Sequence, residues 1–104
     1  MFHPASKITI VAERLLQKSL IAKIEAAGAT GYTIVDGSGK GEHFLRSGDR
    51  ATVVKAFSII RIEAIFAKDD VARALATEIA DSYFSEYSGI VYLSPIEVIQ
   101  KEKF

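Results

Sequence analysis

Residues that could bind an anion gather between positions 35 and 50, in the stretch VDGSGKGEHFLRSGDR. The stretch combines three alternating glycines with three cationic side chains, which are Gly37, Gly39, Gly41, Lys40, Arg46 and Arg50. Alternating glycines allow successive backbone N–H groups to approach an anion closely, and the cations add electrostatic attraction. The same composition suits a flexible linker, so the sequence leaves an anion site and a linker open as two interpretations.

The glycine spacing differs from the common phosphate-binding motifs. A dinucleotide fingerprint requires a helix directly after the glycines, and no helical pattern follows Gly41. A P-loop requires Ser or Thr after its lysine, whereas Lys40 is followed by Gly41. Any anion binding here would therefore belong to a different type of site.

The other reactive side chains do not form a recognisable active site. His43 has no second histidine or acidic cluster at ligand spacing, so no metal site is expected. The chain contains no cysteine, which excludes disulfides, thiolate nucleophiles and iron–sulfur clusters. Glu63 alternates with Arg61 in a half-apolar strand pattern, where a cross-strand ion pair explains it. No Ser, Thr or Lys is accompanied by an activating base, and we expect no enzyme activity.

The charge balance limits the classes of partner. The 104 residues include 13 Lys and Arg and 13 Asp and Glu, which gives a formal net charge of zero. Non-specific nucleic-acid binding and adsorption to anionic membranes both require a cationic surface, so neither is expected. The N-terminal MFHPASK lacks the pattern of a signal peptide, and no apolar run is long enough to span a membrane. We therefore expect a cytoplasmic protein with a single domain over residues 1–104, to which oligomerisation would add buried surface.

Hydrophobic periodicity predicts four strands and two helices to position these residues. Alternating apolar residues predict strands over 7–13, 31–36, 56–66 and 89–94. Apolar spacing of three and four residues predicts helices over 14–28 and 68–84, the first of which ends at Gly28. Pro95 is expected to interrupt the fourth strand and to leave a short edge strand after it.

The order of these elements predicts an α+β protein of ferredoxin-like type, βαββαβ, with one antiparallel sheet and both helices on one face. A segment over about 36–55 joins the second and third strands, where a hairpin normally needs about two to five residues. Connections of that length are mostly functional or disordered. Val11, Ile59 and Ile65 remain on the face away from the helices, which favours an interface over scattered exposed aliphatics on a monomer.

Three runs of sequence carry a resemblance to a known family, namely GYTIVDGSGKG, IRIEAIF and YSGIVYL. Together with the βαββαβ order of elements, these runs make the chain resemble the PII signalling superfamily over nearly all of its 104 residues. The likeness is closest to the PII-like carbon-signalling proteins, which are the SbtB group of cyanobacteria and the carboxysome-associated PII proteins of chemoautotrophs. This resemblance implies a non-enzymatic homotrimer whose open sheet faces meet at its centre and whose intersubunit clefts bind adenine nucleotides.

The resemblance also implies which residues contact the nucleotide. Gly31, Tyr32 and Thr33 match the second strand beside the adenine. Glu63 and Ile65 match a third-strand pair that faces the same cleft. The remaining residues placed at the site, along the loop and near the phosphates, are Gly39, Lys40, Gly41, Arg46, Gly89 and Ile90. No catalytic residue, metal ligand or prosthetic group is implied.

Departures from the family pattern indicate which ligand binds. The segment before Gly89 lacks the TGxxGDGK pattern of nitrogen-sensing PII proteins, and Ile90 stands at the position of their phosphate-binding lysine. Fewer cations imply AMP or ADP, with cAMP or ATP as further options. Bicarbonate is a candidate second ligand.

The implied role is regulation of inorganic-carbon uptake or fixation through the long loop, with a bicarbonate transporter or a carboxysome-linked protein as the target. One alternative is a PII-like regulator of nitrogen metabolism or of another transporter. An enzyme of the same fold, such as an acylphosphatase, is a second alternative, but the phosphate cradle expected near its N-terminus is missing. A metal-tolerance trimer is a third, and His43 alone gives it little support.

Overall fold

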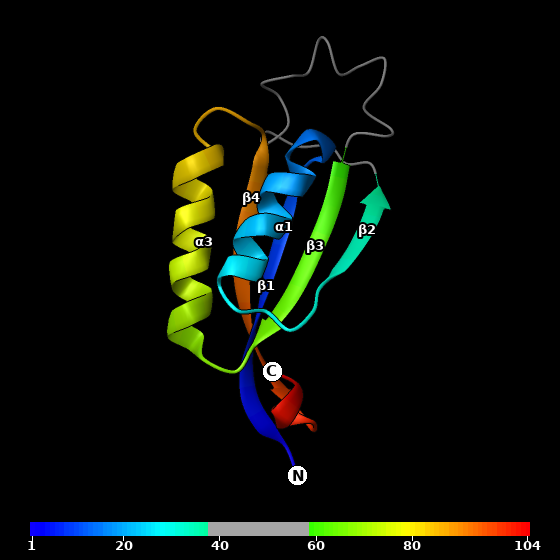
Figure 1. Cartoon of the computed structure of the whole chain (residues 1–104), viewed down its shortest axis with the longest axis vertical. Coiled ribbons are helices and arrows are strands. Elements are labelled where there is room, and N and C mark those ends of the chain that lie inside the picture. The colour runs from blue at the N-terminus through cyan, green and yellow to red at the C-terminus, as the bar shows by residue number, and fades with distance from the viewer. Residues whose placement is uncertain (38–58) are drawn as a thin grey trace.

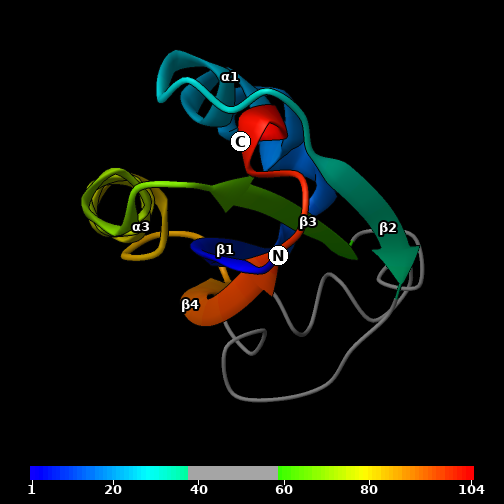
Figure 2. The ribbon, with the colours of Figure 1, turned by 90° about the horizontal axis from the view of Figure 1, so that it is seen from below.

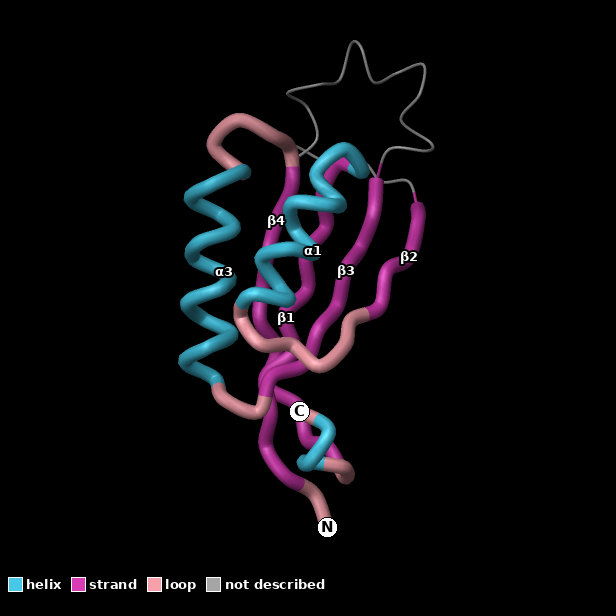
Figure 3. Tube along the Cα trace, viewed as in Figure 1, coloured by secondary structure: helices cyan, strands magenta, loops and turns pink. Residues whose placement is uncertain are grey.

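The computed structural model describes residues 1–37 and 59–104. Its strands are β1 (His3–Glu13), β2 (Thr33–Gly37), β3 (Ile59–Phe66) and β4 (Gly89–Val98). Its helices are the 3₁₀ turn η1 (Arg14–Leu16), α1 (Gln17–Ala26), α3 (Asp69–Tyr83) and the 3₁₀ turn η4 (Lys101–Lys103). Figure 3 shows that these elements follow one another in the predicted order.

Within the described residues the four strands form one antiparallel sheet in the order β2-β3-β1-β4. Both α-helices lie on the same side of this sheet (Figure 1, Figure 2). This is the ferredoxin-like α+β arrangement that the sequence predicts. β2 ends and β3 begins at one end of the sheet, whereas both termini lie at the other end (Figure 1). Most of the predicted loop, from residue 38 onward, lies outside the described residues.

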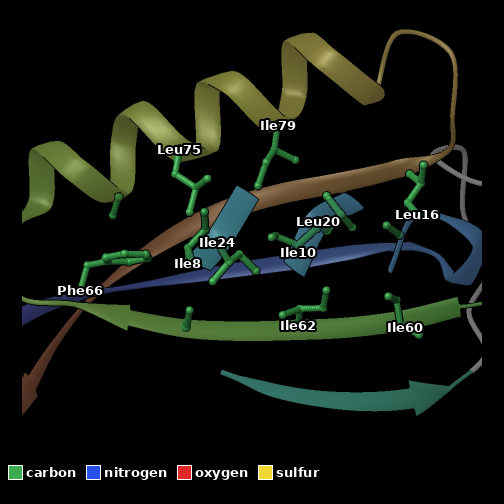
Figure 4. Close-up of a cluster of buried hydrophobic side chains, with 13 residues drawn as sticks. Ile8, Ile10, Leu16, Leu20, Ile24, Ile60, Ile62, Phe66, Leu75 and Ile79 are labelled. Atoms are coloured by element: carbon green, nitrogen blue, oxygen red, sulfur yellow. The ribbon is translucent and has the colours of Figure 1, made fainter. Parts of the chain in front are cut away.

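The hydrophobic core fills the layer between the sheet and the two helices (Figure 4). Every second residue of the two central strands faces the helices, as the predicted alternation requires. The core residues from these strands are Ile8, Ile10, Ala12, Ile60, Ile62, Ala64 and Phe66. The helical side contributes Leu16, Leu20, Ile24, Ala72, Leu75 and Ile79. Full burial of one large aliphatic side chain contributes about 1.5–3 kcal/mol, so this layer holds the helices against the sheet.

The signals at the helix ends are confirmed. Gly28 has a φ angle of 96°, a left-handed conformation that favours glycine and ends the first helix. Asp69 and Asp70 lie in the first turn of α3, where carboxylates interact favourably with the helix dipole. No helix in the described part of the chain is both long and apolar enough to cross a membrane.

Two strands are longer than the sequence predicts. β1 begins at His3 rather than at residue 7, because its first residues pair with the last residues of β4. β4 continues through Pro95 to Val98, so the predicted interruption at Pro95 is wrong. β4 is an edge strand with one unpaired side, and such a strand tolerates a residue that has no N–H group.

The sheet face opposite the helices, hereafter the open face, is partly apolar as predicted. Val11, Ile59 and Ile65 alternate with core residues and therefore lie on it. Ile59 is buried, and the other two are half-buried. The large apolar side chains exposed on the same face are Val35, Ile90 and Tyr92.

Candidate functional site

The residues implied beside the adenine lie together along the β2 edge of the sheet. Gly31 and Tyr32 are exposed and precede β2, rather than beginning it as predicted. Thr33 begins β2 and lies directly opposite Glu63 on β3. Ile65 follows two residues later on the same face as Glu63. The structure thus brings these five positions into one region.

The two other described positions lie at the opposite edge of the sheet. Gly89 and Ile90 begin β4 and pair with Ala12 and Val11 of β1. β3 and β1 separate β4 from β2, and at the usual strand spacing the two edges are roughly 14 Å apart. Within one chain, the structure does not bring the two sets of residues together. The candidate residues outside the described ranges are Gly39, Lys40, Gly41 and Arg46.

Glu63 lies between two cations on the open face. Its Oε2 atom is 3.8 Å from Nζ of Lys7 on β1 and 3.7 Å from Nε of Arg61 on β3. The predicted cross-strand ion pair is therefore present, with Lys7 as the partner on the neighbouring strand. All three side chains are partly exposed, so each pair contributes at most about 1 kcal/mol. Two cations around one carboxylate leave this patch with excess positive charge.

Gly89 has a packing role that is independent of any ligand. A Cβ atom at this position would lie 2.7 Å from Cζ of Phe84 and 2.8 Å from the carbonyl oxygen of Val11. Both distances are well inside van der Waals contact, so a residue without a side chain is required between the ring and the strand. The implied position of Gly89 near nucleotide phosphates stays a prediction.

A carboxylate holds the turn before Gly89. The backbone N–H of Ser88 donates a hydrogen bond of 2.8 Å to Oε2 of Glu13, the last residue of β1. Ser88 is only 4% exposed, and its hydroxyl has no partner in the part of the chain that the structure describes. The sequence contains no signal for this contact, because the two residues are 75 positions apart and share no motif.

An ion pair and a shallow hollow lie at the same end of the sheet. Nη2 of Arg14 is 3.0 Å from Oδ1 of Asp36, which joins the β1–α1 junction to the end of β2. The hollow has a volume of about 220 Å³ and is lined by Val11, Val35, Asp36, Gly37, Ile59, Ile60 and Arg61. Since Val11 pairs with Ile90, the hollow borders the start of β4.

A larger hollow lies on the other side of the sheet. It has a volume of about 750 Å³ and lies between α1 and α3, where Lys23 and Glu78 form an ion pair. None of the predicted site residues lines it, so we do not assign a nucleotide to it. Residues 1–37 and 59–104 contain no group of three or more His, Asp or Glu side chains that could hold a metal ion.

The four-stranded antiparallel sheet with both α-helices on one face (Figure 1) defines a protein of the ferredoxin-like α+β class. A family model described as "Nitrogen regulatory protein P-II" matches residues 5–103. The chain therefore belongs to the P-II family, which confirms the resemblance found in the sequence.

Solved structures place the chain among the PII-like members. A PII-like signaling protein of Thermus thermophilus is 31% identical, with 99% of this chain and 97% of that chain covered and a TM-score of 0.79. CPII of Thiomonas intermedia, bound to ADP, AMP and acetate, is 28% identical, with coverages of 100% and 97% and a TM-score of 0.82. A structure of the same CPII with ADP, AMP and bicarbonate is 27% identical, with coverages of 100% and 96% and a TM-score of 0.80.

Proposed function

We propose that this chain is a non-enzymatic PII-like signalling protein that binds AMP or ADP in clefts between the subunits of a homotrimer. The observation that carries this proposal is the division of the candidate residues between the two outer edges of one sheet. The CPII structures that contain ADP and AMP support the choice of ligand.

The division between edges means that one nucleotide needs two copies of the chain. Thr33 and Glu63 lie at the β2 edge, whereas Gly89 and Ile90 begin the strand at the β4 edge. A nucleotide that contacts both sets would join the β2 edge of one copy to the β4 edge of the next. Such a head-to-tail contact forms a closed ring when the rotation between copies closes, and the family resemblance implies a ring of three.

The open face supplies apolar surface for this assembly. Val35, Ile90 and Tyr92 are 44%, 37% and 46% exposed, although all three are large and apolar. A trimer built around the open face would withdraw the exposed part of each side chain from water. Full burial of a large apolar side chain contributes about 1.5–3 kcal/mol, and less than half of each is still exposed, so each would add roughly 1 kcal/mol. The two helices would then lie on the outside.

The cation content favours nucleotides with few phosphates. β4 contains no lysine or arginine. Arg14 and Arg61, at the end of the sheet where β4 begins, both lie beside carboxylates. cAMP and ATP are further candidates, and Lys40 and Arg46 would supply cations to any of them. The CPII structure that contains bicarbonate supports this ion as a second ligand.

We further propose that residues 36–55 transmit the ligand state to a target in inorganic-carbon uptake or fixation, such as a bicarbonate transporter or a carboxysome-linked protein. Residues 1–104 would form one domain of a cytoplasmic regulator. The family description favours a second candidate, a regulator of nitrogen metabolism or of another transporter. Capture of targets by the tagged protein, from cells limited for inorganic carbon and from cells limited for nitrogen, distinguishes the two candidates.

Subunit complementation tests the site between copies. Gly31→Trp adds bulk at the β2 edge, where a Cβ atom meets no other atom within 4 Å, so folding should be unaffected. Ile90→Trp adds bulk at the start of β4, where the side chain is 37% exposed, and keeps the open face apolar. Each variant alone should lose ADP binding in calorimetry. After co-refolding of the two at equal concentrations, about a quarter of the clefts should combine two wild-type edges and bind ADP.

The result depends on intact assembly, so light scattering must first give the same mass for both variants and the wild type. Recovery of about a quarter of the wild-type stoichiometry would support a cleft shared between copies. If the co-refolded trimers bind no ADP, the two edges do not meet around one nucleotide and the proposed site is wrong.

A further inference from the structure

Glu13 places a negative charge beside the start of β4. It is half-buried at the end of β1, and its Oε2 atom accepts the 2.8 Å hydrogen bond from the N–H of Ser88. Ser88 directly precedes Gly89, and Ala12, the neighbour of Glu13, is the strand partner of Gly89. The carboxylate is therefore fixed one residue away from the position where the proposed site receives phosphates.

The nearby cations of the described chain form their ion pairs with other carboxylates. The neighbouring Arg14 is directed toward Asp36, with 3.0 Å between Nη2 and Oδ1. Arg61 lines the hollow of about 220 Å³ described above, and its Nε atom is 3.7 Å from Oε2 of Glu63. Arg14 and Arg61 thus each lie beside a carboxylate other than Glu13, and Arg61 shares Glu63 with Lys7.

We propose that Glu13 makes the nucleotide site select against additional phosphates, an inference that rests on the proposed function. Backbone N–H groups in a turn before a glycine are natural donors to phosphate, but the Ser88 N–H is already bound to a carboxylate. The same carboxylate repels each phosphate that is added to AMP, because like charges a few ångströms apart interact unfavourably. Glu13 thus accounts for a preference for AMP or ADP over ATP.

The substitution Glu13→Gln separates charge from geometry. Its amide oxygen can still accept the Ser88 N–H, so the turn keeps its anchor while the negative charge is lost. ATP affinity should rise about fivefold in this variant, whereas AMP affinity should change by less than about twofold. Glu97→Gln, an exposed carboxylate at the far end of β4, is the matched control and should leave the ATP to AMP affinity ratio unchanged.

Two further measurements exclude a purely structural role. Glu13→Met is a second neutral variant of similar size that cannot accept the hydrogen bond, and it should shift the ATP to AMP affinity ratio in the same direction. If Glu13 only anchors the turn, the ATP to AMP affinity ratio should be unchanged in Glu13→Gln. AMP and ATP should then lose affinity equally in Glu13→Met. That pattern overturns the inference and leaves the proposed function intact. If the wild-type protein binds no adenine nucleotide, both are wrong.

Discussion

The ring of Phe84 occupies the space that a side chain at Gly89 would need. Phe84 follows the end of α3, and Gly89 begins β4, so this contact sets how closely the helix end approaches the sheet. The carbonyl oxygen of Val11 closes the same space from the strand side. Gly89 is thus required by the fold, whether or not a ligand binds beside it.

Gly89→Ala should therefore destabilise the protein. Because the ring and the strand must both shift to admit a methyl group, we expect a loss of about 1–3 kcal/mol in the free energy of unfolding, measured by urea denaturation. Gly31→Ala is the matched control, since a Cβ atom there has no neighbour within 4 Å. The control should change stability by no more than about 0.5 kcal/mol. Equal values for the two variants would contradict the packing role of Gly89.

Acid should weaken the contact between β1 and α3. Oδ1 of Asp69 accepts a 2.7 Å hydrogen bond from the Ser6 hydroxyl, and this bond, with a further one from Arg73, holds the pKa of Asp69 below its ordinary value of 3.8. The stabilisation is therefore fully present above pH 3.8 and is lost as the pH falls through the lowered pKa.

Asp69→Asn tests this pH dependence. The variant should be less stable than the wild type at pH 7, and the difference in unfolding free energy should shrink as the pH falls below about 4. Asp70→Asn, on the neighbouring exposed carboxylate, is the matched control. A difference between Asp69→Asn and the wild type that stays constant from pH 7 to pH 2 would show that the charge of Asp69 does not contribute.

The oligomeric state tests the open face. Light scattering at micromolar concentration should give about three times the chain mass of 11.4 kDa. Tyr92→Glu places a charge at a 46% exposed position of that face and should shift the mass toward one chain. Leu15→Glu alters a 67% exposed apolar residue in η1 and should leave the mass unchanged. A wild-type mass equal to one chain would refute the assembly and the site between copies.

Arg46 should contribute to phosphate binding. It lies outside the described residues, and the family resemblance alone assigns its role. Loss of a charge-assisted hydrogen bond should weaken ADP binding by about 1.5–3 kcal/mol in Arg46→Ala, measured by calorimetry. Lys18→Ala, on the exposed side of α1, is the control for a general change in charge. Unchanged affinity in Arg46→Ala would remove Arg46 from the site.

Bicarbonate and nucleotide should bind cooperatively. A phosphate that orders the Gly39 to Gly41 backbone reduces the entropy lost when a second anion binds to the remaining N–H groups. We expect bicarbonate to strengthen the binding of AMP or ADP by about 1 kcal/mol. The nucleotide should strengthen the binding of bicarbonate by the same amount. Nucleotide titrations at constant pH and ionic strength, with chloride replaced stepwise by bicarbonate, measure this coupling. A dissociation constant that does not move would reject bicarbonate sensing and leave nucleotide binding unaffected.

Local periodicity made most of the fold predictable. The alternation of Ile60, Ile62 and Ala64 with Ile59 and Arg61 assigns the two faces of β3 correctly, because successive side chains of a strand point to opposite sides. The left-handed end of the first helix was predictable at Gly28 for a similar reason, since only local backbone conformation decides it.

The strand ends were less predictable, because pairing partners decide them. The N-terminal half of β1 has no strong alternation, and it is a strand because the end of β4 lies beside it. Pro95 would break a central strand but is accommodated at an edge, and only the strand order reveals that β4 is an edge.

The amino-acid sequence by itself determined the element types, the apolar faces and the family. Tertiary structure alone decided that Thr33 and Gly89 lie on opposite edges of the sheet, that Glu13 binds the N–H of Ser88, and that Phe84 packs over Gly89. Element type follows from interactions between residues a few positions apart, which spacing in the sequence records directly. Contacts between residues as far apart as Glu13 and Ser88 depend on strand order and register, which are set by how the whole core packs.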